Sequence, residues 1–141
     1  MNADLEKARE LLIREGHTCV ICRRDEVYAD TQRGVKPLLD LLDHGVRLPG
    51  FSAADKVIGK ATAFLYVLLG VCAVYTPVIS ASAKDVLTKN GIELYFDLEV
   101  EGIENRTKTG PCPMESAVKN IDRPDVALAA IRKKYAEITR K

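Results

Sequence analysis

Apolar residues along the chain switch between helical and strand spacing. Residues 3–15 repeat at helical spacing and stop at Gly16, which predicts a helix. The apolar runs 18–22 and 27–29 are rich in strand formers and flank Arg24-Asp25, so they predict a hairpin. Residues 35–42 return to helical spacing, and Pro49-Gly50 predicts a turn before the next element.

The stretch from Ser52 to Val74 is the centre of the prediction. Its first half mixes charged and small residues, and its second half is apolar on every side. Ser52 with Asp55 three residues later has the form of a capping box, so we expect a helix that begins at Ser52 and ends near Gly70. This helix would be buried at one end. At its other end it would present four residues to a site: Asp55, Lys56, Gly59 and Lys60.

The remaining patterns predict strands joined through helices. A buried strand over 72–79 precedes a helix over 80–90, and a half-buried strand over 92–98 follows, with a possible short strand near 100–103. Cys112-Pro113 and Asp122-Arg123-Pro124-Asp125 each open a further helix. This order predicts an α/β fold: a three-layer α/β/α sandwich around a mixed sheet, in one domain spanning residues 1–141.

Composition and charge exclude several classes of protein. The run 61–83 has no charged residue, but Gly70 and Pro77 interrupt it, so we expect a buried helix and strand and no membrane span. A formal net charge of +1 argues against a nucleic-acid partner. With no signal peptide and four cysteines, we expect a cytoplasmic protein with reduced thiols.

The cysteines divide into structural and chemical candidates. Cys19 and Cys22 form a CxxC, but on a strand this spacing points the two side chains to opposite faces. We therefore interpret both as core residues, and Cys72 likewise. Cys112 stands at a helix start, where the thiolate is favoured, and Glu115 follows close enough to cap the helix or carry a proton. The alternative for Cys112 is an ordinary N-cap residue.

Several charged residues are candidates for binding or catalysis. Lys56 and Lys60 lie one helical turn apart, and Gly59 beside them would let a ligand approach the backbone. A lysine held there would act as a base or bind an anion, or the pair is simply exposed with Asp55 as a cap. Two further positions are candidate anion sites or plain turns: Arg33-Gly34, before a helix start, and Arg106, in the loop 105–110.

Four segments carry a resemblance to a known family. They are Arg33–Leu38, Gly50–Lys56, Gly59–Ala61 and Cys112–Glu115. Their sequences resemble those of a small bacterial family of unknown function that is assigned to the cytidine deaminase-like superfamily. The resemblance covers nearly the whole chain and implies a deaminase-like fold.

The zinc motif of that superfamily is missing from this chain. Zinc deaminases place His-x-Glu and Pro-Cys-x-x-Cys at two helix starts. In this chain the corresponding positions fall near 59–61 and 79–83, and neither contains His, Cys or Glu. A zinc centre needs at least three protein ligands, so we predict no metal and no cofactor. The superfamily also includes metal-free enzymes, so the resemblance leaves other chemistry open.

Two functional hypotheses remain. The first is a metal-independent enzyme acting on a small nucleoside- or nucleotide-like ligand. Its predicted catalytic residues are Lys60, Cys112, Asp55 and Glu115, and its predicted binding residues are Arg33, Gly34, Lys56, Gly59 and Arg106. The second is a non-catalytic small-molecule-binding or regulatory domain that kept the pocket and lost the chemistry. A weaker reading is an interaction module completed by a homodimer.

Overall fold

The computed structural model describes residues 1–32, 34–104 and 112–139. Its helices are α1 (Ala3–Glu15), α2 (Lys36–Asp43), α3 (Lys60–Leu69), α4 (Ala81–Lys89), α5 (Pro113–Val118) and α6 (Pro124–Thr139). Its strands are β1 (Cys19–Arg23), β2 (Glu26–Asp30), β3 (Ser52–Asp55), β4 (Val57–Ile58), β5 (Ala73–Ser80) and β6 (Glu93–Val100). The termini of most elements fall within two residues of the predicted ones.

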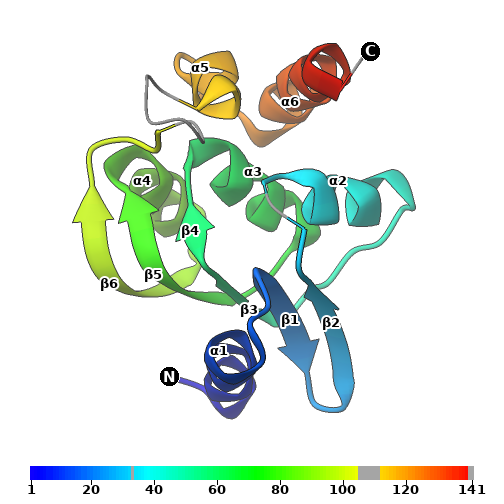
Figure 1. The fold of residues 1–141 in the computed structure, drawn as a ribbon, viewed down its shortest axis with the longest axis vertical. Coiled ribbons are helices and arrows are strands. Elements are labelled where there is room, and N and C mark those ends of the chain that lie inside the picture. The colour runs from blue at the N-terminus through cyan, green and yellow to red at the C-terminus, as the bar shows by residue number, and fades with distance from the viewer. Residues whose placement is uncertain (33, 105–111, 140–141) are drawn as a thin grey trace.

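The strands form one mixed sheet. Strand β1 is antiparallel to both β2 and β3, and β5 is parallel to β3, β4 and β6. Ser52 is opposite Ala73 and Val57 is opposite Val78, so β4 continues the line of β3 along β5 after a bend at Lys56. The sheet therefore runs β2-β1-β3/β4-β5-β6, with β2 and β6 at its outer edges (Figure 1).

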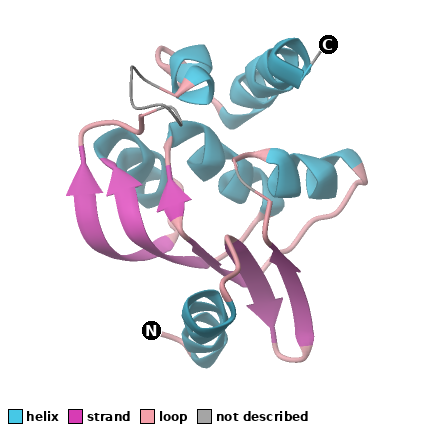
Figure 2. Cartoon of the chain, viewed as in Figure 1, coloured by secondary structure: helices cyan, strands magenta, loops and turns pink. Residues whose placement is uncertain are grey.

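Helices cover both faces of this sheet, as predicted (Figures 1 and 2). On one face α1 buries Leu5, Ala8 and Leu12 against side chains of β1, β3 and β5. The other face packs against α2, α3 and α4 in a larger core, and α5 and α6 lie against α3 beyond them. Helix α3 is enclosed on nearly all sides, which explains why its sequence has no charged residue after Lys60.

The prediction of a helix beginning at Ser52 is wrong. Residues 52–54 are strand positions buried between β1 and β5, and the Ser52 hydroxyl donates to the Asn2 side-chain oxygen, 3.1 Å away. The same Asn2 oxygen accepts the Leu5 backbone N–H and so caps α1. The helix begins at Lys60, with Gly59 as its N-cap, and ends at Gly70. Sheet pairing on both sides outweighs the weak local preference of Ala53 and Ala54 for helix.

The remaining predictions have mixed outcomes. Cys19 packs in the larger core and Cys22 in the core beneath α1, which confirms that they lie on opposite faces of the sheet. Cys72 is exposed, so its assignment to the core is wrong. Strand β6 extends to Val100, and the possible short strand near 100–103 does not form as a separate element. Among the described helices, none is both long and apolar enough to cross a membrane.

Candidate functional site

The start of α3 is closed by a side chain from α5. The Glu115 carboxylate accepts the backbone N–H of Lys60 at 2.8 Å and that of Ala61 at 3.1 Å. These N–H groups have no partner within the helix, and a carboxylate at this end also faces the positive pole of the helix dipole. A side chain at Gly59 would meet the Glu115 carboxylate at 2.5 Å. Gly59 therefore allows a close approach to the backbone, and Glu115 makes it; the approach of a ligand at this position stays a prediction.

Lys60 binds the C-terminal end of α5. Its Nζ donates to the backbone carbonyl of Lys119 at 3.0 Å, at the C-cap of α5, and lies 5.8 Å from the centre of the Phe64 ring. Glu115 and Lys60 thus tie the short helix α5 to the start of α3 through three hydrogen bonds. This arrangement holds the first turn of α3 in place without an external anion.

The structure brings together only part of the predicted site. Lys56 is exposed at the bend between β3 and β4, and Cys112 is the N-cap of α5, partly buried against the core. Gly34 adopts a positive φ of 75° in the turn before α2. Arg33 and Arg106 lie outside the described residues. The catalytic and binding roles assigned to these residues remain predictions.

Asp55 takes part in a different arrangement from the expected helix cap. Its Oδ2 accepts the Tyr66 hydroxyl at 2.6 Å, and that hydroxyl oxygen lies 3.2 Å from the Cys19 sulfur. Cys19 is directly opposite Asp55 in the β1–β3 ladder, and Tyr66 comes from the middle of α3. A hydrogen-bonded chain therefore runs Asp55–Tyr66–Cys19 through the layer between the sheet and α3.

Burial controls the protonation of this chain. It raises the pKa of Asp55 to about 7, although the Tyr66 hydroxyl and backbone N–H groups act in the opposite direction. Burial and the nearby Asp55 carboxylate also raise the pKa of Tyr66 and of the Cys19 thiol. Near neutral pH, Asp55 is thus the member of the chain that gains and loses a proton, while Tyr66 and Cys19 stay protonated.

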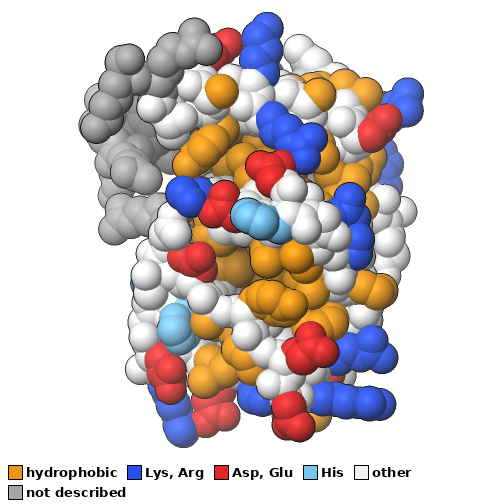
Figure 3. Space-filling view, turned by 90° about the vertical axis from the view of Figure 1, so that its right-hand side faces the viewer, with side chains coloured by type: hydrophobic (Ala, Val, Ile, Leu, Met, Phe, Trp, Pro, Cys, Tyr) orange, Lys and Arg blue, Asp and Glu red, His pale blue; other side chains and the backbone are white. Residues whose placement is uncertain are grey.

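The Cys19 end of the chain borders a cavity between the β1–β2 hairpin and α2. The cavity has a volume of about 310 Å³. Its polar or aromatic lining residues are Cys19, Tyr28, Asp30, Asp40 and His44; its apolar ones are Ile21, Ala29, Pro37, Leu38, Leu41 and Val46. Figure 3 shows the corresponding face of the molecule, on which hydrophobic side chains gather around a hollow bordered by charged side chains. An apolar hollow with a few polar groups is the usual form of a small-molecule site.

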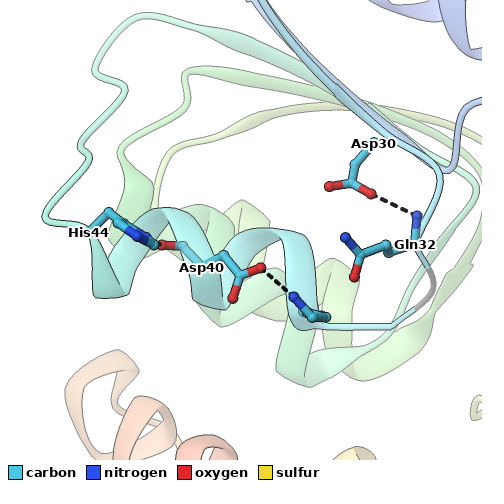
Figure 4. Close-up of polar contacts among 5 residues, drawn as sticks. Asp30, Gln32, Asp40 and His44 are labelled. Carbon is cyan, nitrogen blue, oxygen red and sulfur yellow. Dashed lines mark hydrogen bonds and ion pairs between the residues drawn. The ribbon is translucent and has the colours of Figure 1, made fainter.

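The polar groups of the cavity are largely acceptors (Figure 4). The Asp30 carboxylate accepts the Gln32 backbone N–H, and the Asp40 carboxylate accepts Lys36 Nζ, both at 2.7 Å. His44 Nδ1 lies 2.7 Å from the Asp40 backbone oxygen. A carbonyl oxygen can only accept, so Nδ1 carries the proton and leaves Nε2 of a neutral His44 as an acceptor. A ligand with hydrogen-bond donors would match this set.

Sequence reasoning missed most of these residues. Tyr66 lies in an apolar run that carries no polar signal, and Cys19 was interpreted as a core residue only. Asp30, Asp40 and His44 come from two elements, and their convergence depends on how α2 packs against the hairpin. Within the described parts of the chain, no three His, Cys, Asp or Glu side chains are grouped so as to hold a metal ion. That the protein works without a metal remains a prediction.

Replacing Glu115 tests its role as the cap of α3. Glu115→Ala leaves two N–H groups of a buried helix without their charged acceptor, so we expect the free energy of unfolding to fall by about 1–3 kcal/mol in urea denaturation. The control is Glu6→Ala, an exposed glutamate in the first turn of α1, which should change it by less than about 0.5 kcal/mol. Equal small effects of both substitutions would show that Glu115 does not hold α3.

Asp55 makes a pH-dependent contribution to stability. The folded state keeps the Asp55 proton up to pH about 7, whereas an unfolded aspartate releases it near pH 4. The stabilisation from protonated Asp55 is therefore complete below pH 4 and is lost as the pH rises to 7. We expect the stability of Asp55→Asn relative to the natural protein to increase by about 1–3 kcal/mol between pH 4.5 and 7.5.

The matched control is Asp97→Asn. Asp97 accepts the Tyr75 hydroxyl at the same 2.6 Å distance but is exposed on β6. Its substitution removes the same kind of contact at a solvated site and so provides the reference profile. A profile of Asp55→Asn that does not differ from this reference would contradict the protonated Asp55. The measurement is chemical denaturation of the three proteins at several pH values.

Comparisons with known proteins agree with this architecture. The family described as TM1506, domain of unknown function (DUF1893), matches residues 7–135. The crystal structure of a DUF1893 family protein (TM1506) from Thermotoga maritima is similar, with a TM-score of 0.84 and 20% identity over 97% of this chain and 92% of that one. At this identity the likeness shows the fold alone. No curated protein matches the chain. With the family matching most of its length, the chain belongs to the DUF1893 family.

Proposed function

We propose that this protein is a small-molecule-binding domain of the cytidine deaminase-like superfamily whose ligand occupies the cavity between α2 and the β1–β2 hairpin. The single observation that carries the proposal is the cavity itself, about 310 Å³ and largely apolar, with Asp30, Asp40 and His44 in its lining. This volume lies at the lower end of the range for small-molecule sites. The start of α3 is less suitable for a ligand, because Glu115 already occupies its backbone N–H groups.

A nucleoside-like ligand suits the chemistry of the cavity. A flat heteroaromatic ring can lie against the apolar side chains of Leu38, Leu41 and Tyr28, which all line the cavity. Amino and imino groups on its edge can donate to the Asp30 or Asp40 carboxylates and to His44 Nε2. Asp30 and Asp40 keep their partners Gln32 and Lys36, so discrimination would rest on the remaining acceptor positions of these carboxylates and on His44 Nε2.

A metal-independent enzyme is the second candidate, and the Asp55–Tyr66–Cys19 chain favours it. The thiol at the cavity wall is linked by hydrogen bonds to a carboxyl whose pKa is about 7. General acid–base catalysis is most effective with a group that titrates near the working pH. Asp55 would then exchange a proton with the ligand through Tyr66 and Cys19. Turnover of a bound nucleoside would establish this candidate over the binding domain.

A thermal-shift screen against nucleobases, nucleosides and nucleotides tests the proposed site. A bound ligand stabilises the folded state by about 2.7 kcal/mol at one hundred times its dissociation constant, so a rise in melting temperature is expected. Leu41→Trp should fill the cavity and abolish this rise. Leu11→Trp is the matched control, because Leu11 is a partly buried helical leucine on the opposite face of the sheet.

Two results would contradict the proposal. One is a ligand whose stabilising effect survives Leu41→Trp, which would place its site elsewhere. The other is the absence of stabilisation by any compound of the three classes. The screen is repeated with a chelator to test whether the protein holds a metal. A melting temperature that falls on chelation would overturn the expected absence of a metal.

A further inference from the structure

Strand β6 presents an open backbone edge. It pairs with β5 on one side and is the outermost strand of the described sheet (Figure 1). The Glu93 N–H donates to the Cys72 carbonyl at 3.0 Å, in the ladder that aligns Glu93 with Ala73. Backbone groups alternate in direction along a parallel strand, so Glu93 and every second residue after it face β5. The N–H and C=O groups of Leu94, Phe96 and Leu98 therefore point outward from the sheet.

The side chains of β6 divide into an acidic row and an apolar row. Glu93, Tyr95, Asp97 and Glu99 point to one face, where the Tyr95 and Tyr75 hydroxyls donate to Glu93 and Asp97. The described ion pair on this row is Lys84–Glu99, at 3.0 Å. The other row packs Leu94 against the core but leaves Phe96 36% and Leu98 56% exposed. A long edge strand with exposed apolar side chains is unusual, because such edges recruit other chains.

A second copy of the protein does not suit this edge. In a two-fold antiparallel pair, opposing residues must point to the same face of the sheet. Centring such a pair on Phe96 opposes Glu93 with Glu99, and centring it on Leu98 opposes Asp97 with Glu99. Centring it on Asp97 opposes the two copies of Asp97. Each of these three registers, which pair the middle of β6, places carboxylates directly opposite carboxylates, and this destabilises the pairing.

We propose that the β6 edge binds an extended polypeptide segment in which lysine or arginine alternates with apolar residues. The segment adds to the sheet as a further strand through the outward backbone groups of Leu94, Phe96 and Leu98. Its basic side chains lie beside Glu93 and Asp97 on one face. Its apolar side chains cover Phe96 and Leu98 on the other. This surface lies on the opposite edge of the sheet from the hairpin that borders the cavity, so the inference is independent of the proposed ligand.

Amide hydrogen exchange with designed peptides tests the proposal. A seven-residue peptide alternating lysine and valine should slow the exchange of the Phe96 and Leu98 amides by at least about tenfold at saturation, because these amides gain acceptors. A peptide alternating glutamate and valine is the matched control and should leave them unchanged. Equal protection by both peptides, or protection by neither, would overturn the proposal.

Two variants separate backbone pairing from charge. Leu98→Pro removes one outward N–H of the edge strand and should abolish peptide binding. Leu98→Ala keeps this N–H and loses only apolar contact, so it should weaken binding much less than Leu98→Pro. Glu93→Gln combined with Asp97→Asn should weaken binding of the lysine peptide by about tenfold at low salt. If Leu98→Pro fails to fold, the charge variant alone decides, and unchanged affinity in it overturns the proposal. The proposal is also overturned if the protein does not bind the peptide but forms a concentration-dependent dimer, and if Leu98→Ala and the charge variant change that dimer.

Discussion

The hydrogen bond between Tyr66 and Asp55 joins the sheet to α3, the helix at the centre of the larger core. Asp55 ends the central strand β3, and Tyr66 lies at the middle of α3 with its ring fully buried. A carboxyl in this layer without a partner would cost several kcal/mol, so the Tyr66 hydroxyl and the protonation of Asp55 are both conditions for packing α3 on the sheet. The same hydroxyl reaches Cys19 and so fixes one wall of the cavity. The fold and the proposed ligand site thus depend on one buried polar contact.

A second polar contact closes the start of α3. The helix is too apolar to supply its own capping side chain, and Gly59 has none, so Glu115 provides the acceptor from 55 residues along the chain. Gly59 is needed because any side chain there would displace that carboxylate. The result resembles an anion site that the chain fills by itself. This explains why the sequence around Gly59 and Lys60 looks like a ligand-binding motif while its immediate partner is a residue of the same molecule.

Hydrophobic spacing predicted the helices that bury one face. Helices α1 and α4 follow this rule, and Gly16 and Ser80 mark ends that local chemistry determines. The rule failed at Ser52–Asp55, since a strand paired on both sides and buried on both faces has no alternation to detect. The site was predicted less well. Asp55, Gly59, Lys60 and Glu115 were recognised as unusual, but their partners are set by long-range packing that no local pattern encodes.

The titration of Asp55 tests the central claim most directly. The ¹³C chemical shift of its side-chain carboxyl, followed from pH 3 to pH 9, should give a midpoint near 7 because burial raises the pKa of this group. In Tyr66→Phe the midpoint should move higher still, since the hydroxyl that favours the charged form is gone. A midpoint near 4 in both proteins would mean that Asp55 is solvated, and it would contradict the buried chain from Asp55 to the cavity.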